Sequence, residues 1–119
     1  MAKVKTNVAR PGYSAMHRYA RIAPRKVRLI TDMIRGMSCN QAVETLRFTH
    51  NRGASFVTKV LQSAMANANE QEANMNRLRV AEARVDEGPI IKRWHPKDRG
   101  RAHPIFKRTS HIVVAVSEV

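Results

Sequence analysis

The sequence predicts an α+β domain with a long protruding β-hairpin, and three observations support this fold class. Apolar residues recur at helical spacing over residues 24–36 and 52–72. An alternating pattern starts at Leu78 and an apolar run covers residues 112–116, as expected for two strands. The segment 89–108 between them is rich in basic side chains and proline, so we expect it to extend away from the core.

The first helix is predicted to begin at Pro24 and to end at Gly36. Proline is favoured at the first helical position, and glycine is favoured just after the last turn. Val27, Ile30 and Ile34 share one face of this helix, which should pack on the core. The basic residues that project mainly from its other faces are Arg25, Lys26, Arg28 and Arg35.

Two further helices are predicted. Ser38 with Gln41 three residues later is a capping-box pattern, which indicates a short second helix that ends near residues 49–51. Its expected buried residues are Ala42, Val43 and Leu46. The third helix, over residues 52–72, has the strongest helical periodicity, and its small apolar residues indicate close packing against another element. The core positions of this helix are Val57, Val60, Leu61, Ala64, Met65 and Ala68.

Three segments are predicted to be strands. A short strand is expected over residues 16–22, a second starts at Leu78, and a third covers residues 110–116. A turn near residues 98–100 would pair the last two in an antiparallel hairpin. The cross-strand neighbours that this turn predicts are Val80 with Val116 and Arg84 with Ile112.

The segment 89–108 is expected to form the outer part of this hairpin. Pro89, Pro96 and Pro104 cannot donate to a sheet ladder, but they are tolerated in a two-stranded ribbon beyond the body. Gly100, beside the expected tip, allows positive φ or a close backbone approach to a partner. Two strands of about ten residues reach roughly 30 Å. Such a ribbon is marginal alone in water, so its order should come from what it touches.

Charge is unevenly distributed along the chain. The 119 residues include 22 lysines and arginines and nine acidic residues, a net charge of +13. Residues 1–35 hold nine bases and one acid, residues 36–91 hold six of each, and residues 92–119 hold seven bases and two acids. Two basic flanks around a neutral middle are typical of a surface that binds a polyanion, and nucleic acid is the first candidate.

Other partner and function classes have little support. The longest purely apolar run is far shorter than the roughly 20 residues that span a bilayer, and no signal-peptide pattern follows the first lysines, so we expect no membrane insertion. Cys39 is the sole cysteine, which excludes an internal disulfide and a cysteine-cluster zinc site. The sequence shows neither a recognisable Ser-His-Asp arrangement nor a glycine-rich phosphate-binding loop. We therefore expect no catalytic residue, no metal and no cofactor.

Candidate nucleic-acid contacts come from both basic flanks. Lysine and arginine neutralise phosphates, and arginine also binds phosphate bidentately or stacks on bases. An exposed tryptophan offers a flat face to an unpaired base. The candidate RNA-binding residues are Arg18, Arg21, Arg25, Lys26, Arg28, Lys92, Arg93, Trp94, Lys97, Arg99, Arg101, Lys107 and Arg108.

Some of the arm residues have two interpretations. Trp94 either stacks on a base or anchors the arm by packing on Ile105 or Phe106. His95 and His103 would need further ligands to hold a metal, so contact with solvent or RNA is favoured for them.

Three stretches resemble a single protein family. Residues 85–118 read VDEGPIIKRWHPKDRGRAHPIFKRTSHIVVAVSE and closely resemble the C-terminal hairpin of the ribosomal protein twenty-two family of the bacterial-type large subunit. The VDEGP opening, the KR pair, GRA near the tip and the KRTSHI return are highly specific in combination. RIAPRKVRLITDMIRG at residues 21–36 and KVLQSAMANA at residues 59–68 match the same family. The resemblance covers about residues 16–118.

The resemblance implies about three helices packed on a small three-stranded antiparallel sheet, with the hairpin threaded into large-subunit ribosomal RNA. It implies a structural role in subunit assembly, inside a cytoplasmic or organellar ribosome, with no homo-oligomer. The implied partners are ribosomal RNA, neighbouring ribosomal proteins and the nascent polypeptide, because the hairpin tip of this family lines the peptide exit tunnel. Carried over, the tip residues near the tunnel would be Trp94, His95, Pro96, Lys97, Asp98, Arg99, Gly100 and Arg101.

This tip departs from the commoner family pattern, which is richer in arginine and aliphatic residues. The departures are Trp94, His95, Asp98, His103 and Pro104.

We expect one domain over residues 16–118, preceded by a flexible basic arm over residues 1–15. Two other functions remain open from the residues alone. A DNA architectural protein uses a basic β-arm with a proline near its tip to bend a duplex. A phosphate-handling enzyme would show turnover that a single substitution abolishes.

Overall fold

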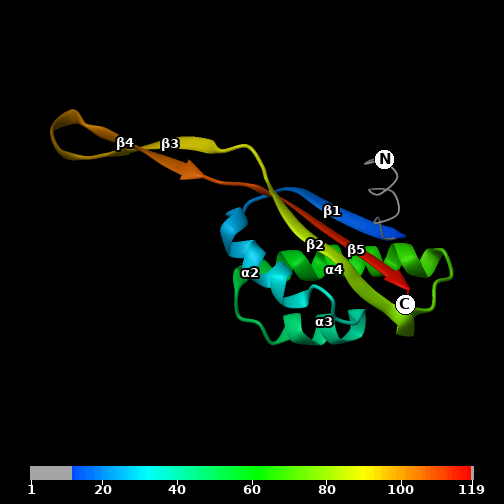
Figure 1. Ribbon diagram of the computed structural model, residues 1–119. Coiled ribbons are helices and arrows are strands. Elements are labelled where there is room, and N and C mark those ends of the chain that lie inside the picture. Colours follow the sequence, from blue (N-terminus) through cyan, green and yellow to red (C-terminus); the bar gives the residue numbers. More distant parts are fainter. Residues whose placement is uncertain (1–11, 119) are drawn as a thin grey trace, which may run out of the picture.

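The computed structural model describes residues 12–118, in which three helices lie on one face of a small sheet and a thin arm leaves the body (Figure 1). Residues 1–11, and with them most of the expected N-terminal arm, lie outside this range. Short 3₁₀ turns cover Met75–Arg77 and Asp98–Gly100. The elements in chain order are β1 (Tyr13–Ala20), α2 (Pro24–Ile34), α3 (Cys39–Arg47), α4 (Arg52–Glu70), β2 (Leu78–Glu87), β3 (Ile91–Pro96), β4 (Ala102–Lys107) and β5 (Ser110–Glu118).

The sheet of the body has the order β1-β5-β2, and both pairings are antiparallel. In the central strand β5, Ile112, Val114 and Val116 are fully buried in the core between the sheet and the helices. Strands β3 and β4 form a separate two-stranded sheet. The predicted fold class, three helices on a three-stranded antiparallel sheet with a protruding hairpin, is therefore confirmed.

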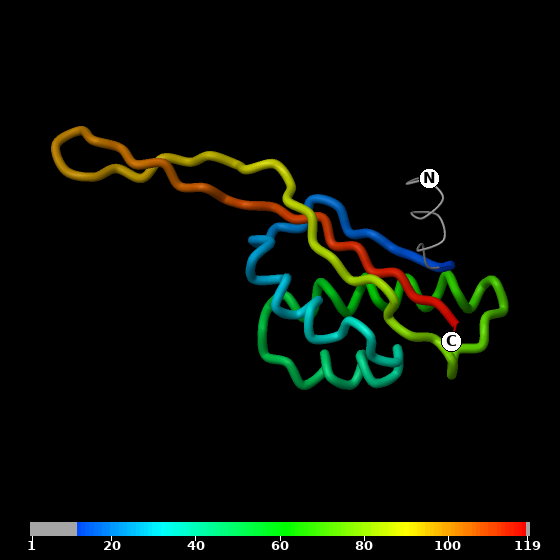
Figure 2. The backbone as a smooth tube through the Cα atoms, viewed as in Figure 1, coloured from blue at the N-terminus to red at the C-terminus, as the bar shows by residue number. Residues whose placement is uncertain are grey.

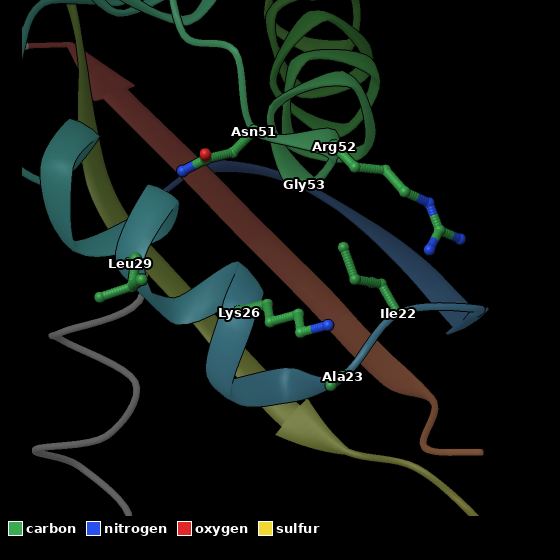
Figure 3. A pocket seen from close by; sticks show the side chains of 7 residues that line it. All are labelled: Ile22, Ala23, Lys26, Leu29, Asn51, Arg52 and Gly53. Atoms are coloured by element: carbon green, nitrogen blue, oxygen red, sulfur yellow. The ribbon is translucent and has the colours of Figure 1, made fainter.

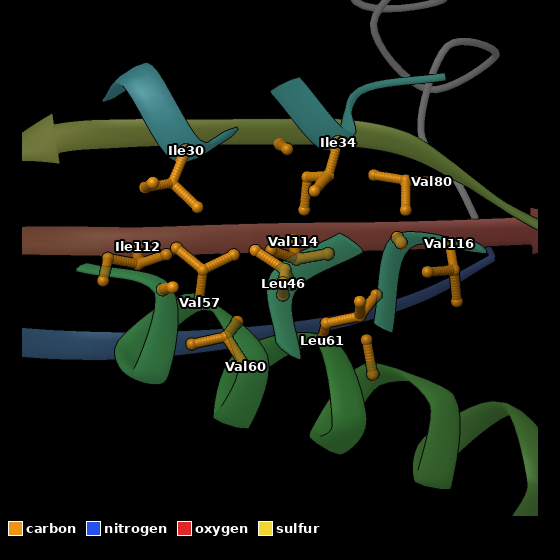
Figure 4. Close-up of a cluster of buried hydrophobic side chains, with 14 of the residues drawn as sticks. Ile30, Ile34, Leu46, Val57, Val60, Leu61, Val80, Ile112, Val114 and Val116 are labelled. Atoms are coloured by element: carbon orange, nitrogen blue, oxygen red, sulfur yellow. The ribbon is translucent and has the colours of Figure 1, made fainter. Parts of the chain in front are cut away.

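The core lies between the sheet and the helices (Figure 4). The predicted apolar face of α2 is buried, and Pro24 and Gly36 bound this helix as expected, with Gly36 at a φ of 86° just after it. The side chain of Ser38 accepts a hydrogen bond from the Gln41 backbone N–H at 3.3 Å, which caps α3. The predicted core positions of α4 are all buried except the partly buried Met65: Val57, Val60, Leu61, Ala64 and Ala68.

Two sequence expectations need correction. Strand β1 covers Tyr13–Ala20 instead of residues 16–22, because its pairing with β5 continues to Val116. The second concerns the register of β2, where Val80 does face Val116 but Arg84 faces Val113. A β-bulge between Val80 and Glu82 shifts the pairing by one residue, so that Val85, not Arg84, lies opposite Ile112.

β2 is an edge strand, and the segment after α2 covers part of that edge. The Val80 N–H donates to the Met37 carbonyl at 2.9 Å, and the Gly36 N–H donates to the Val80 carbonyl at 3.0 Å. Farther along the strand, the Arg35 guanidinium donates to the Ala83 carbonyl. Open sheet edges are templates for pairing with other chains, so these bonds protect the edge.

The arm continues β2 and β5 beyond the body (Figure 2). A compact chain of this length has a radius of gyration of about 13.5 Å, whereas this protein has 17.4 Å and a longest extent of 63 Å. Every residue of β4, and all of β3 after Ile91, is exposed. The arm therefore has no core of its own, as the sequence predicts.

Close backbone packing fixes the base of the arm. The Gly88 N–H donates to the Thr109 carbonyl at 2.9 Å, and the Thr109 hydroxyl donates to the Pro89 carbonyl at 2.6 Å. The buried Ser110 hydroxyl donates to the Ile22 carbonyl, in the segment that joins β1 to α2. The first two bonds join the two strands at the arm base, and the third ties the start of β5 to the body.

Replacing Gly88 with alanine is expected to loosen this base. A Cβ atom at Gly88 would lie 2.4 Å from the Thr109 hydroxyl oxygen and 3.3 Å from the Thr109 carbonyl. The overlap must either turn the Thr109 hydroxyl away from the Pro89 carbonyl or displace one strand, so we expect a loss of about 1–3 kcal/mol in the free energy of unfolding, measured by urea denaturation. Gly12→Ala is the control, because no atom lies within 4 Å of its Cβ. Equal stability of both variants would contradict this account of the arm base.

Cys39 gives the stability a predictable pH dependence. The thiol is fully buried at the start of α3, and desolvation raises its pKa from 9.0 to about 11. The thiol ionises at a lower pH in the unfolded chain than in the folded protein. The stability that the buried neutral thiol contributes is therefore fully present below pH 9.0 and is lost as the pH rises toward 11. The unfolding free energy of the wild type should therefore fall more steeply over this range than that of Cys39→Ala. Parallel curves would contradict the prediction.

Candidate nucleic-acid interface

The candidate residues of the first basic flank lie around the start of α2. Arg18 is on β1, Arg21 follows β1, and Arg25, Lys26 and Arg28 are on α2. All five are exposed. Ala20 pairs with Ser110, and the Ser110 hydroxyl bonds to the Ile22 carbonyl, so this end of the body adjoins the base of the arm.

A pocket of about 290 Å³ lies at this end, where the first turns of α2 and α4 meet (Figure 3). Lys26 of α2 and Arg52 of α4 are both among the residues that line it. Neither Ala23 nor Asn51, the residues that precede these helices, caps its helix with a side chain, and neither first turn contains an acid. The unpaired N–H groups at a helix start carry partial positive charge and attract anions. Lys26, Arg52 and the backbone of both helix starts therefore all favour an anion at this pocket.

Arg52 is a basic residue of this surface that the sequence analysis did not single out. Its guanidinium donates to the Arg21 carbonyl at 2.6 Å and lies 5.5 Å from the centre of the Phe56 ring. In the sequence it belongs to the neutral middle segment. Arg52 and Lys26 line the same pocket only because the starts of α2 and α4 meet in the folded protein. No local sequence pattern indicates that contact.

Arg28 differs from its neighbours, because its guanidinium already bonds within the protein. Nη2 donates to the Val85 carbonyl at 3.1 Å and Nε to the same oxygen at 3.4 Å. An arginine has five N–H donors, so donors remain for a phosphate. Arg28 therefore has two roles: it protects the edge of β2 through the Val85 carbonyl, and it remains exposed among the basic residues of this end.

The register of the arm sorts its side chains onto two faces. Directly opposed residues of an antiparallel pair share a face, and successive residues alternate. Trp94 pairs with Pro104, and His95 pairs with His103. We call the first set the aromatic face: Lys92, Trp94, Pro96, Ala102, Pro104 and Phe106. The second set is the histidine face: Ile91, Arg93, His95, His103, Ile105 and Lys107.

The prolines of the ribbon occupy positions that require no ladder hydrogen bond. The Lys97 N–H donates to the Arg101 carbonyl at 2.6 Å, which makes Pro96 and Ala102 a non-hydrogen-bonded pair. Because the two pair types alternate, Trp94 with Pro104 is also a non-hydrogen-bonded pair. Side chains of such pairs lie closer together than those of hydrogen-bonded pairs. Both prolines thus fit the ribbon without loss of a bond.

The tip turns at the predicted place. The Arg101 N–H donates to the Asp98 carbonyl at 3.1 Å, and both Arg99 and Gly100 have positive φ, 53° and 77°. The positive φ of Gly100 fits the role expected for it. A shallow, open hollow at the tip is lined by Lys97, Asp98, Arg99, Arg101 and His103.

A single acid and, within the described residues, no ion pair oppose the positive charge of the arm. Within residues 12–118, ion pairs join Arg35 to Asp32 and Arg84 to Glu82 and Asp86, all of them in the body. Asp98 is the single acid among the seven bases of residues 89–108. The arm charges are therefore free to interact with an external polyanion.

Trp94 is 67% exposed on the aromatic face. Ile105 projects from the opposite face, which excludes it as the packing partner of Trp94. Phe106 shares the face of Trp94, but no ring contact joins them in the described part of the chain. Most of the indole is thus accessible to a partner.

Membrane-spanning helices and clusters of metal-ligating side chains are both absent from the described residues. No helix within residues 12–118 combines the length and the apolar character that crossing a bilayer requires. Among the same residues, histidine, cysteine and carboxylate side chains do not gather in threes that could hold a metal ion.

Comparison with known proteins identifies the family. The family model of ribosomal protein L22p/L17e matches residues 15–117. The large ribosomal subunit protein uL22 of Thermus thermophilus is 56% identical over 105 residues, which cover 87% of this chain and 93% of the relative. The uL22 of Desulfosudis oleivorans is 49% identical over 105 residues, with 88% and 92% coverage.

These matches confirm the resemblance found in the sequence, and they agree with the expectation of a structural protein rather than an enzyme. The chain belongs to the ribosomal protein L22p/L17e family.

Proposed function

We propose that this protein is a structural component of the large ribosomal subunit, where it binds and cross-braces ribosomal RNA. The observation that carries the proposal is that basic side chains gather at one end of the body and along the arm that leaves it. Arg21, Lys26 and Arg52 lie at the end of the body from which the arm projects, and the arm adds seven bases. The described part of the first basic flank therefore adjoins the arm.

The physical form of the arm supports the same function. A two-stranded ribbon with exposed side chains gains little stability from itself, so contacts with a partner must order it. Neutralisation of phosphates supplies affinity, and a surface along both the body and the arm can contact RNA segments that are distant in sequence. We expect recognition of shape and of unpaired elements, because the major groove of A-form RNA is too narrow for side chains to read.

The position of the tip is part of the proposal. The relatives carry the name large ribosomal subunit protein uL22, and the family resemblance implies a hairpin tip that lines the nascent-peptide tunnel. We propose that residues 94–101 lie near the tunnel wall, with the nascent polypeptide and neighbouring ribosomal proteins as further partners. The protein acts in subunit assembly, in a cytoplasmic or organellar ribosome.

The proposal is tested by quantitative mass spectrometry of large subunits that have been washed at high salt. We expect this protein at near one copy per subunit and its near absence from small subunits. Large subunits that lack it, with the protein recovered on DNA instead, would overturn the proposal.

A further inference from the structure

The aromatic face of the arm combines large exposed rings with positive charge. Trp94 is 67% exposed and Phe106 is 47% exposed. Pro104 lies directly opposite Trp94, and the whole of β4 is exposed. Within residues 12–118, nothing covers this face. Isolated exposed apolar residues are ordinary, but two rings and two prolines on one face of a six-residue ribbon form a patch that fits a partner.

The charges beside these rings decide which partner the face fits. Lys92 stands opposite Phe106, and the Arg108 guanidinium lies 5.8 Å from the centre of the Phe106 ring. A partner of this face must therefore offer negative charge and flat apolar groups together. RNA with unpaired bases has both, because every base has a π-face beside a phosphate. An apolar protein groove lacks the negative charge.

We propose that the aromatic face binds unpaired bases of ribosomal RNA by stacking, with Trp94 as the principal ring and Phe106 as its neighbour. The histidine face, with Arg93 and Lys107, then meets phosphates on the opposite side. Diagonal neighbours across a ribbon are about 7–8 Å apart, and Trp94 and Phe106 are such neighbours. The two rings therefore stand on the same face of the ribbon, where each can contact a base. The inference rests on the proposed function and specifies the ligand chemistry of one of its surfaces.

Trp94 fluorescence gives a direct test, because the chain has a single tryptophan. The full-length protein is titrated with a twelve-nucleotide oligoadenylate RNA and with an abasic twelve-mer that carries the same number of phosphates. Both probes should bind, since both neutralise arm charges. The oligoadenylate should quench Trp94 strongly and the abasic probe weakly. Equal quenching by both probes, or quenching by neither, would overturn the inference.

Substitutions separate ring stacking from general affinity. Trp94→Leu should weaken binding of oligoadenylate roughly 5- to 150-fold, since stacking on one base contributes about that factor, and should leave binding of the abasic probe unchanged. Trp94→Phe should retain part of the affinity. Ile105→Ala is the control, because Ile105 is a partly exposed apolar residue on the histidine face, and it should change affinity less than twofold. An equal loss for both probes, or for Ile105→Ala, would refute base stacking.

Failure of this inference is distinguishable from failure of the proposed function. If Trp94→Leu binds oligoadenylate as well as the wild type, while binding to large-subunit RNA keeps its salt dependence, base stacking is overturned and the function stands. If the protein shows no preference for large-subunit RNA over other nucleic acids, the function fails whatever Trp94 does. Quenching that requires another ribosomal protein and no RNA would assign the face to a protein contact and overturn the inference.

Discussion

Replacing Lys97 and Arg101 together with glutamine is expected to weaken binding to large-subunit ribosomal RNA about 10- to 30-fold at about 0.15 M salt. Each lost phosphate contact lowers the slope of log affinity against log salt by about 0.7–0.9, so the pair should lower it by about 1.4–1.8. Both residues line the hollow at the tip, and neither forms an ion pair within residues 12–118. Filter binding across a salt series measures both quantities.

The matched control replaces Arg47 and Lys59 with glutamine. Both residues are exposed, on α3 and α4, and lie in the neutral middle segment. Their replacement removes one arginine and one lysine, as the tip variant does. If position and not net charge governs binding, this variant should keep the slope of the wild type. The same loss in both variants would show that net charge alone acts, which contradicts a specific role for the arm.

Replacing Leu61 with alanine is expected to cost about 2–5 kcal/mol of the free energy of unfolding. Leu61 is fully buried in α4, where it packs beneath the central strand β5 (Figure 4). The change removes apolar contacts and leaves a cavity, and a domain of this size has only about 5–15 kcal/mol in total. Because Trp94 is in the arm, urea denaturation should be followed by far-ultraviolet circular dichroism, which reports on the helices.

Leu29→Ala is the control for this substitution. Leu29 is 68% exposed on α2, so its truncation should change the unfolding free energy by less than about 0.5 kcal/mol. If the two leucine variants lost equal stability, the assignment of the core to the sheet face of α4 would be wrong.

The sequence predicted most of the body because each element has a local signal. Pro24 and Gly36 mark the ends of a helix through their own backbone preferences, and the period of the apolar residues in α4 selects the face that is buried. The turn at residues 98–100 follows from Gly100 and the surrounding polar residues. All of these depend on a few neighbouring residues, which a sequence displays directly.

The register of the sheet could not be predicted in full. The β-bulge between Val80 and Glu82 shifts the pairing of Arg84 by one residue, and neither glycine nor proline marks that place. The role of Arg28 was also hidden, since its bond to the Val85 carbonyl joins residues that are 57 positions apart. Such features arise from tertiary contacts and have no local pattern.

The charge distribution in the sequence predicted which segments belong to the candidate site, but not how their side chains are arranged. Counting charges found the arm and the first flank, yet it placed Arg52 in the neutral middle. Phe106 was considered only as a packing partner of Trp94. The division of the arm into two faces depends on the parity of the β3–β4 register, which places Trp94 opposite Pro104. If the β3–β4 register were shifted by one residue, Trp94 would no longer lie opposite Pro104.

We propose that the basic arm and the adjoining end of the body together bind large-subunit ribosomal RNA. The most direct test of this binding is titration of the purified protein with that RNA across a salt series, with bent duplex DNA as competitor at matched salt. We predict a clear preference for the RNA, with log affinity falling steeply as log salt rises. Equal or tighter binding to bent DNA would contradict the claim and favour an architectural role on DNA.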